Sequence, residues 1–440
     1  MNGLCFMRIM VKGGNGIDSL FPRPKGKTVS VLKKSIWRKI GFGIGVFLLI
    51  GLGTAQFFKK DLIRLQFVLT LFDAHGIVEN FRSMTRVFEY RTVRRSGPIY
   101  RIPYESKRLP EFYSYQGSLH DLAQWIERTG TSGIIIIHDG KIAFERYYRG
   151  NSATTHWISW SVCKSFVSAL IGFAIEDGLI GSLSDPVTDY VPLLKASGYN
   201  GVALKDVLQM SSGIGFNEDY ADFNSDINRM GRTFALGTAM DDFVVSLKNA
   251  RPPGTFNHYV SMDTQVLGMV LREATGRSLS AYMEEKLWSR LGTESDAFWI
   301  VDGTGMELAF GGLNALLRDY VRFGLLFLNE GRNFRDQQIL PAQWIRDSVA
   351  PSRPHLLPGA SNPASSSPLG YGYQWWLPET PDGDYCAIGI YGQFIYVHPR
   401  YRVVIAKTSA YADYNQTGDE MEYESLAVFR SLAANMDRHP

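Results

Sequence analysis

Two kinds of apolar pattern divide the body of the chain. Residues 133–138 form a nearly uninterrupted apolar run, which is followed by the turn pair Asp139-Gly140 and by a second apolar segment at residues 141–148. Asp-Gly between two such segments is a strong signal for a β-hairpin. Further strands are predicted near the C-terminus, at residues 385–390, 393–398 and 403–407. Strands at both ends of the body predict one sheet to which both ends contribute.

Between these strands, apolar residues recur at three- and four-residue steps, the spacing of a helix with one buried face. The clearest case is residues 161–177, which end before the helix-stopping Gly178. Residues 216–226 are acidic and irregular, as in a loop over a pocket, and residues 351–368 are a surface loop rich in Pro and Ser. The body therefore combines a sheet with a helical insert at about residues 180–330. Its other predicted helices lie at residues 204–210, 241–249, 263–275, 278–290 and 315–329.

The N-terminal region has a different pattern. Residues 40–58 are nineteen residues without a charge, about the length that crosses a bilayer as a helix. Nine lysines and arginines precede them, so the positive-inside rule predicts a cytoplasmic basic tail at residues 1–39, a transmembrane anchor at 40–58 and the rest of the chain on the far side. Residues 59–110 are expected to form a stalk and entry segment that docks on the body at 111–440. A cleaved signal peptide, cut at Gly53-Thr54-Ala55, and a buried core helix are the alternatives.

The formal charge of +3 is unevenly distributed. Residues 1–60 carry eleven lysines and arginines against one aspartate, a net +10, which leaves a net −7 for the remainder. An acidic body argues against nucleic-acid binding. Three cysteines do not form a disulfide framework. Cys5 would lie in the cytoplasm, and no sequence feature supports a Cys163–Cys386 bridge, so Cys163 is expected to pack behind the 161–177 helix.

Ser161 and Lys164 stand three residues apart at the start of the 161–177 helix, on one face. A serine becomes a good nucleophile when a neighbouring base takes its proton. Lysine can be that base only when it is neutral, which at its reference pKa holds for on the order of one amine in a few thousand at pH 7. Burial and the positive end of a helix lower that pKa. The Ser161 N–H also points in front of the helix, where an oxyanion can sit.

The spacing alone does not establish a catalytic pair, because Ser30-Val-Leu-Lys33 in the basic tail matches it by chance. Other motifs follow in order, and as an ordered set over about residues 110–435 they resemble the serine β-lactamase/penicillin-binding superfamily. The similarity is to its class C and esterase-like branch, in particular to serine hydrolases of the 6-aminohexanoate-dimer hydrolase type. The motifs are Ser161-Val-Cys-Lys164, Pro253-Gly254-Thr255, Tyr259-Val260-Ser261, Gly311-Gly312-Leu313, Arg318-Asp319, Phe323-Gly324 and Gly389-Ile390-Tyr391-Gly392-Gln393.

This resemblance implies a β-lactamase-like fold of the α/β (α+β) class, with an antiparallel sheet flanked by helices and an all-helical subdomain. It implies that Ser161, Lys164 and Tyr259 are catalytic, with the phenol of Tyr259 relaying a proton to the leaving group. The backbone N–H groups of Ser161 and Ile390 would form the oxyanion hole. The substrate-binding residues that it implies are Tyr220, Ser261, Asn314 and Gly389.

The sequence allows two roles for each of several neighbouring residues. Tyr220 can contact the substrate or remain a surface-loop tyrosine, and Trp375-Trp376 can wall the pocket or pack in the core. His258 is a candidate base, but the chain lacks the Gly-x-Ser-x-Gly elbow that would support a Ser/His/Asp triad. A surface or packing role is therefore favoured for His258.

The third motif of the superfamily departs from its usual form. In place of Lys-Thr-Gly or His-Thr-Gly the chain has Ala387-Ile388-Gly389, without a cation or a hydroxyl. A β-lactam or D-alanine carboxylate needs a charge-assisted partner. The departure therefore argues against β-lactamase and carboxypeptidase activity, whereas the Ala-x-Gly form fits the amide-hydrolase branch.

The sequence thus predicts a membrane-anchored serine hydrolase that cleaves a small amide or ester through an acyl-enzyme. No metal or organic cofactor is implied, since the carboxylates of residues 216–226 fit no EF-hand and no histidine accompanies them. The expected location is a bacterial inner membrane, crossed once, with the catalytic domain in the periplasm. A penicillin-binding-type peptidoglycan peptidase and a catalytically silent tethered scaffold are the alternatives, and the oligomeric state is left open.

Overall fold

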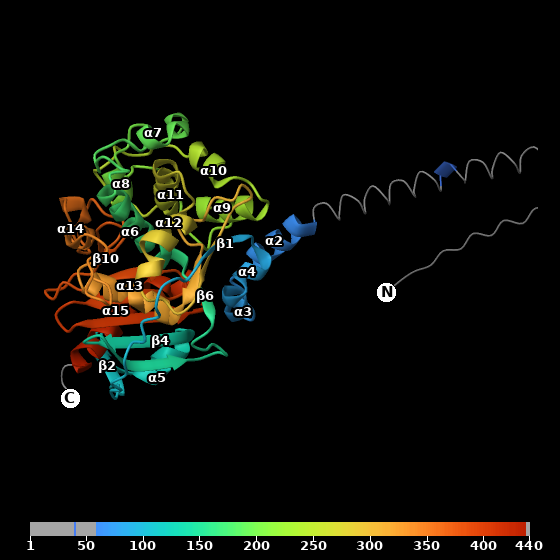
Figure 1. Ribbon diagram of the computed structural model, residues 1–440. Coiled ribbons are helices and arrows are strands. Elements are labelled where there is room, and N and C mark those ends of the chain that lie inside the picture. The colour runs from blue at the N-terminus through green and yellow to red at the C-terminus, as the bar shows by residue number, and fades with distance from the viewer. Residues whose placement is uncertain (1–38, 41–58, 437–440) are drawn as a thin grey trace, which may run out of the picture. The chain divides into compact units, whose positions relative to one another are not determined.

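A seven-stranded antiparallel sheet forms the centre of the fold, with the strand order β5-β4-β13-β12-β11-β10-β9 (Figure 1). The computed structural model describes residues 39–40 and 59–436, and the sheet belongs to a compact unit that begins at Lys60. The predicted sheet with contributions from both ends of the body is confirmed. Its strands are β4 (Thr131–His138), β5 (Lys141–Tyr147), β9 (Gly370–Tyr371), β10 (Trp376–Leu377), β11 (Tyr385–Gly389), β12 (Gln393–His398) and β13 (Val403–Ser409).

Both faces of this sheet are covered, which explains the four consecutive isoleucines in β4. Ile134 and Ile136 belong to the core on one face, and Ile135 and Ile137 to the core on the other, and all four are at most 1% exposed. A strand buried on both faces has a continuous apolar run instead of an alternating pattern. The covering helices are α5 (Leu122–Arg128) and α15 (Tyr414–Met436) on one face, and α6 (Cys163–Glu176) and α13 (Leu317–Leu328) on the other.

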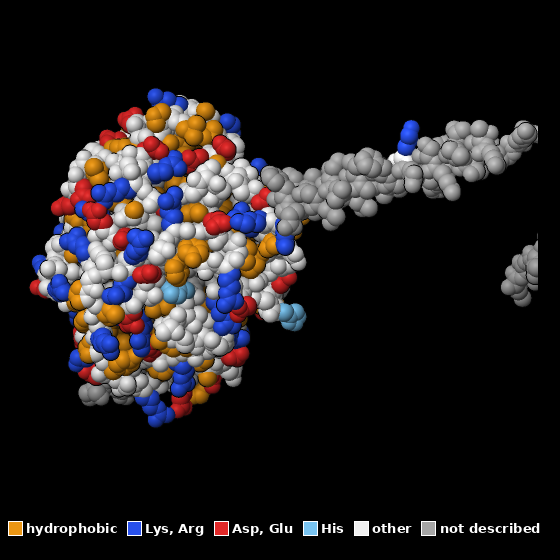
Figure 2. Space-filling model, turned by 45° about the vertical axis from the view of Figure 1, so that its right-hand side comes forward, with side chains coloured by type: hydrophobic (Ala, Val, Ile, Leu, Met, Phe, Trp, Pro, Cys, Tyr) orange, Lys and Arg blue, Asp and Glu red, His pale blue; other side chains and the backbone are white. Residues whose placement is uncertain are grey.

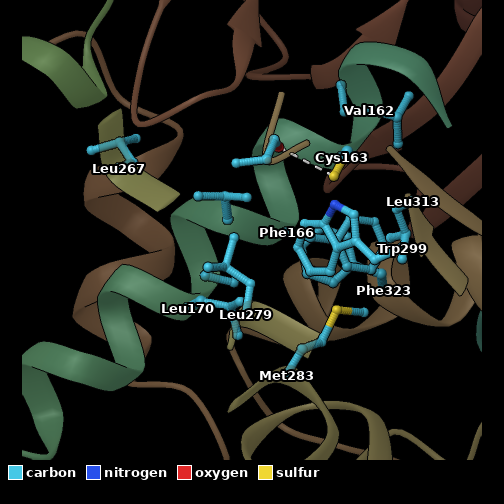
Figure 3. Packing of buried hydrophobic residues seen from close by; sticks show 14 of the residues in the cluster. Val162, Cys163, Phe166, Leu170, Leu267, Leu279, Met283, Trp299, Leu313 and Phe323 are labelled. Carbon is cyan, nitrogen blue, oxygen red and sulfur yellow. Dashed lines mark hydrogen bonds between the residues drawn. The ribbon is translucent and has the colours of Figure 1, made fainter. Parts of the chain in front are cut away.

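Helix α6 is buried over almost its whole length, since every residue from Cys163 to Ala174 is buried. Figure 3 shows Phe166 of α6 packed among side chains of several other elements, and its ring stacks on that of Phe323 with centroids 3.8 Å apart. The Cys163 thiol donates a hydrogen bond to the carbonyl of Ala309 over 3.3 Å. Cys163 and Cys386 are both free and buried, so no bridge joins them.

A group of helices lies above the large sheet in Figure 1. The protein also has a second antiparallel sheet, with the strand order β1-β7-β8-β6. Strands β7 and β8 fall within residues 180–330, so the predicted all-helical insert is wrong there. Both strands are only four residues long and largely buried, and periodicity does not separate such strands from buried helix. The elements are α7 (Val187–Tyr190), α8 (Leu204–Leu208), α9 (Asp226–Ala235), α10 (Met240–Ser246), α11 (Ser261–Thr275), α12 (Leu279–Lys286), β1 (Tyr90–Val93), β6 (His156–Ile158), β7 (Ala297–Ile300) and β8 (Leu313–Leu316).

Residues 59–88 dock on the body through aromatic contacts. The ring of Phe72 stacks on Tyr391 at 4.4 Å between centroids and lies 5.6 Å from Trp160, and Phe81 lies 5.3 Å from Trp160. This segment therefore reaches the residue that precedes Ser161. Its helices are α2 (Lys59–Thr70), α3 (Ile77–Arg82) and α4 (Met84–Val87); the remaining elements of the body are β2 (Phe112–Tyr115), β3 (Ser118–Asp121) and α14 (Ala342–Ser348).

The predicted anchor at residues 40–58 and the basic tail lie outside the described residues, apart from residues 39 and 40. Among the residues that the structure does describe, no helix is both long and apolar enough to cross a bilayer. On the face of the body that Figure 2 presents, Lys and Arg side chains are interspersed with Asp and Glu. That face carries no broad patch of a single charge.

Candidate active site

Ser161 lies in a short 3₁₀ turn, Trp160–Val162, that leads directly into α6. Trp160 has a φ of 43°, a left-handed conformation that is strained for a tryptophan. The end of β11 lies directly against this turn, because a Cβ added to Gly389 would sit 2.7 Å from the Ser159 carbonyl oxygen and 3.1 Å from the Ser161 nitrogen. Only glycine allows this approach. The glycine therefore brings the next residue, Ile390, beside the nucleophile.

Lys164 is one helical turn further on and is 2% exposed. Its Nζ donates hydrogen bonds to the Ser161 Oγ at 2.7 Å, to the Ser261 Oγ at 3.2 Å and to the Phe310 carbonyl at 3.1 Å. Burial lowers the pKa of Lys164 to about 8, while the negative charge of Glu218 acts in the opposite direction. A pKa near 8 leaves about one amine in ten neutral at pH 7, and a neutral amine can accept the serine proton.

Tyr259 comes two residues before α11 and faces the same space. Its ring centroid is 4.8 Å from the Nζ of Lys164, and the ring stacks on Trp376 at 5.2 Å. Burial raises the pKa of Tyr259 well above its ordinary value, the charge of Glu218 raises it further, and a hydrogen bond with Ser161 opposes both effects. The phenol is therefore protonated at neutral pH and is available as a proton donor.

Glu218, which the sequence analysis did not single out, is a carboxylate whose charge raises the pKa of both Lys164 and Tyr259. It accepts hydrogen bonds from the backbone N–H of Ser261 and, at 3.3 Å, from the hydroxyl of Tyr220. Burial raises the pKa of Glu218, and the charge of Lys164 lowers it. Glu218 thus fastens the acidic loop to the first residue of α11 and sets the charge that Lys164 faces. The sequence signal that could have identified Glu218 was its position two residues before Tyr220, in the same acidic loop.

Two adjoining cavities open on Ser161. The larger, about 690 Å³, is lined by Tyr259 and Trp376, and the smaller, about 380 Å³, is lined by Trp160 and Phe310. Both volumes lie in the range of small-molecule sites. The residues that line both cavities are Ser161, Tyr220, Ala221, Ile390 and Asn415.

The structure brings most of the predicted site residues to this place. Tyr220 lines both cavities, Ser261 contacts Lys164, and Gly389 lies behind Ser161 without being part of either lining. Asn314 does not reach either cavity, because its side chain in β8 donates to the backbone carbonyls of Phe298 and Gly312. Its location does not support the predicted contact with the substrate.

The structure also gives the positions of the residues for which the sequence left two roles open. Trp376 lines the larger cavity, whereas Trp375 is completely buried in the core. A ring nitrogen of His258 is 2.9 Å from the Phe216 carbonyl, which fits a packing role. In the acidic loop, Asp219 and Asp222 accept hydrogen bonds from the loop's own backbone N–H groups. The loop carboxylates thus support its turns.

Helix α15, which the sequence analysis missed, contributes Asn415 and Glu422 to the cavity wall.

Comparison with known proteins places this geometry in a family. The model of the β-lactamase family matches residues 122–428. The 6-aminohexanoate-dimer hydrolase of Paenarthrobacter ureafaciens is 29% identical over 323 residues, which cover 72% of this chain and 79% of that protein. A β-lactamase of Pseudomonas fluorescens is 23% identical over 182 residues, covering 40% of this chain and 47% of that protein.

A solved structure gives the same result at the level of the fold. A Bacillus anthracis protein described as a 6-aminohexanoate-dimer hydrolase superposes with a TM-score of 0.75 at 25% sequence identity, covering 84% of this chain and 97% of that one. The resemblance drawn from the motifs is thereby confirmed. The chain belongs to the β-lactamase family and is a serine hydrolase of the amidase or esterase type.

Proposed function

We propose that the protein cleaves a small amide or ester through an acyl-enzyme on Ser161, with Lys164 as the base. The observation that carries the proposal is the 2.7 Å hydrogen bond between the Lys164 Nζ and the Ser161 Oγ, made by an amine whose burial lowers its pKa to about 8. A charged lysine can only donate to the serine, whereas the neutral form can take its proton.

The reaction then follows from the neighbours of Ser161. As the Ser161 Oγ bonds to the substrate carbonyl carbon, its proton passes to Lys164. The N–H groups of Ser161 and Ile390 hold the oxyanion, an arrangement supported by the close approach of Gly389 to the Ser161 nitrogen. When the C–N or C–O bond breaks, Tyr259 gives its proton to the leaving group and regains one from Lys164. Water then hydrolyses the acyl-serine ester and releases the acid.

The charges around Ser161 favour cleavage of a small amide or ester over peptidoglycan peptidase activity. The larger cavity is lined by several acidic residues, and the described residues that line it include no lysine or arginine. The described part of the cavity wall thus offers no charge-assisted partner of the kind that a D-alanine carboxylate needs. The relative from Paenarthrobacter ureafaciens, named for the hydrolysis of a 6-aminohexanoate dimer, supports a small amide as one substrate. The acidic residues are Glu218, Asp219, Asp419, Glu420 and Glu422, and burial raises the pKa of Glu422 to about 8.

We also propose that residues 40–58 anchor the protein in a bacterial inner membrane, with residues 1–39 in the cytoplasm and the body in the periplasm. The support is the uncharged nineteen-residue run with its basic flanks. In fractionated cells the full chain is expected to stay in the membrane pellet after alkaline carbonate washing. A chain lacking residues 1–58 should be released, and recovery of the full chain in the soluble fraction would contradict the anchor.

The catalytic proposal is tested with a panel of small amides and p-nitrophenyl esters, together with a fluorophosphonate that labels reactive serines. The wild type is expected to turn over members of the panel and to be labelled, whereas Ser161→Ala does neither. If Ser161→Ala turns over these substrates at the wild-type rate, the proposal is overturned. Stable labelling by fluorescent penicillin would instead favour a penicillin-binding function, and a wild-type Ser161 that does not react with the fluorophosphonate would favour the silent scaffold.

A further inference from the structure

The two cavities beside Ser161 differ in chemistry. The larger one carries the acidic residues named above, whereas the walls of the smaller one are mostly apolar. These walls come mainly from the docked N-terminal helices and from α9. Representative residues, all buried or half-buried, are Val68, Leu71, Met84, Phe88, Met230 and Phe234.

The position of Tyr259 tells which cavity receives which half of the substrate. Tyr259 lines the larger cavity and not the smaller one. In the proposed reaction the phenol protonates the leaving group, so the leaving group must lie on its side of Ser161. The acyl group, which stays bonded to Ser161, then extends the other way. The smaller, apolar cavity is therefore on the acyl side.

We infer that the natural substrate is an ester or amide of a medium- or long-chain aliphatic acid, whose hydrocarbon chain occupies the smaller cavity. This inference rests on the proposed function and specifies its acyl group. A cavity of about 380 Å³ continuous with the nucleophile has room for such a chain. Its two charged lining residues do not offer a site for a polar chain end, because Asp73 is exposed and the guanidinium of Arg232 is stacked on Phe223 at 3.9 Å.

Part of the apolar wall lies outside the region that the family model matches. Residues 59–88 precede the matched region, which begins at residue 122. Leu69 and Phe223 line the cavity but are 54% and 60% exposed, so they stand at its solvent edge. An aliphatic chain would cover such exposed apolar groups as it enters. The motifs around Ser161 thus specify the reaction, whereas the docked N-terminal helices and α9 together shape the space proposed for the acyl group.

A chain-length series tests the inference. The full chain in lipid nanodiscs, where no free detergent competes for the cavity, is given p-nitrophenyl acetate, butyrate, octanoate and dodecanoate. Each buried methylene is expected to raise kcat/KM by up to about fourfold. The ratio of kcat/KM for dodecanoate to that for acetate should therefore be at least about tenfold. A ratio near one, with turnover that depends on Ser161, would overturn the inference and leave the proposed function intact.

A glycine in the cavity wall allows the space to be filled. Gly231 of α9 lines the cavity, and a Cβ added there meets only the Cγ1 of Val68, at 3.8 Å. Gly231→Phe is expected to lower the dodecanoate-to-acetate ratio about tenfold or more, and Gly231→Ala only slightly. The matched control is Leu236→Phe, since Leu236 follows the same helix, is 53% exposed and lines neither cavity. An equal loss on both esters in Gly231→Phe would count against an acyl site.

Binding without turnover separates the two proposals. Ser161→Ala is titrated with a fluorescent fatty acid, alone and combined with Gly231→Phe. Saturable binding that the second substitution weakens about tenfold supports the acyl cavity even if no ester in the series is hydrolysed, in which case the proposed function is what fails. No saturable binding, or binding that is insensitive to Gly231→Phe, overturns the acyl cavity.

Discussion

Two buried lysines in this protein each hydrogen-bond to a serine, and they have very different surroundings. Lys164 donates to Ser161, and Lys407 of β13 donates to Ser409. Lys164 is 2% exposed and Lys407 1%, and burial lowers the pKa of Lys164 to about 8 and that of Lys407 to about 7. Within the described residues neither amine forms a salt bridge. By amine chemistry alone, both pairs could activate a serine.

The difference lies in what surrounds the hydroxyl. Ser409 is completely buried, and the Nζ of Lys407 lies 5.1 Å from the ring centroid of Trp125 and 5.9 Å from that of Phe394. Ser161 instead opens on two cavities and has the backbone of β11 beside it. A nearby amine with a lowered pKa is therefore necessary for this chemistry but not sufficient. The serine must also be reachable and must face donors for the oxyanion.

The largest expected effect comes from removing each hydroxyl. Ser161→Ala is expected to lower kcat at least about 10³-fold, because the acyl-enzyme cannot form. Ser409→Ala should leave kcat within about twofold, since no substrate reaches it. Both are measured at saturating ester, with circular dichroism to verify folding. A folded Ser409→Ala protein with a loss like that of Ser161→Ala would break the comparison.

The next effect comes from removing each amine while keeping an unbranched side chain. Lys164→Met is expected to lower the rate of acylation roughly 10²- to 10⁴-fold, because the general base is lost. Lys407→Met should have little influence on this rate. Stopped-flow measurement of the acylation burst checks both. Near-normal acylation in Lys164→Met would remove Lys164 from the role of base.

A smaller effect is expected from pH. Since the neutral form of Lys164 is the active one and its pKa is about 8, kcat/KM should rise about tenfold per unit below that pH and level off above it. Glu218→Gln should move this inflection to lower pH, because the charge of Glu218 raises the pKa of Lys164. The matched variant Glu422→Gln lies in the same cavity and is expected to move the inflection less. An upward shift in Glu218→Gln would contradict the assigned interaction.

The smallest effect on turnover, and the clearest on stability, is expected at Lys407. Its pKa of about 7 in the folded protein lies below the value of about 10.4 for an unfolded lysine. Between these values the unfolded chain binds more protons, so this group makes the free energy of unfolding rise with pH from about 7 to 10. Lys407→Met should reduce that rise in urea titrations at pH 7 and 9. An unchanged rise would mean that the amine is solvated.

The sequence predicted the parts of the site that depend on near neighbours. Ser161 and Lys164 share a face because they are three residues apart at a helix start, and Asp139-Gly140 gave the β4–β5 hairpin because both residues adopt the positive φ of such a turn. The strands β7 and β8 and the long helix α15 were missed. Their buried or mixed faces do not produce a clear single period.

What the sequence determined by itself was local: the reactive pair at the start of α6, the central strands and the ordered motifs that point to the family. Only the tertiary structure decided which Lys–Ser pair faces a cavity, that Glu218 reaches the start of α11 and that residues 59–88 wall an apolar space beside Ser161. The physical reason is that helix and strand geometry follow from adjacent backbone angles. Contacts between residues far apart in the chain depend instead on how whole elements pack.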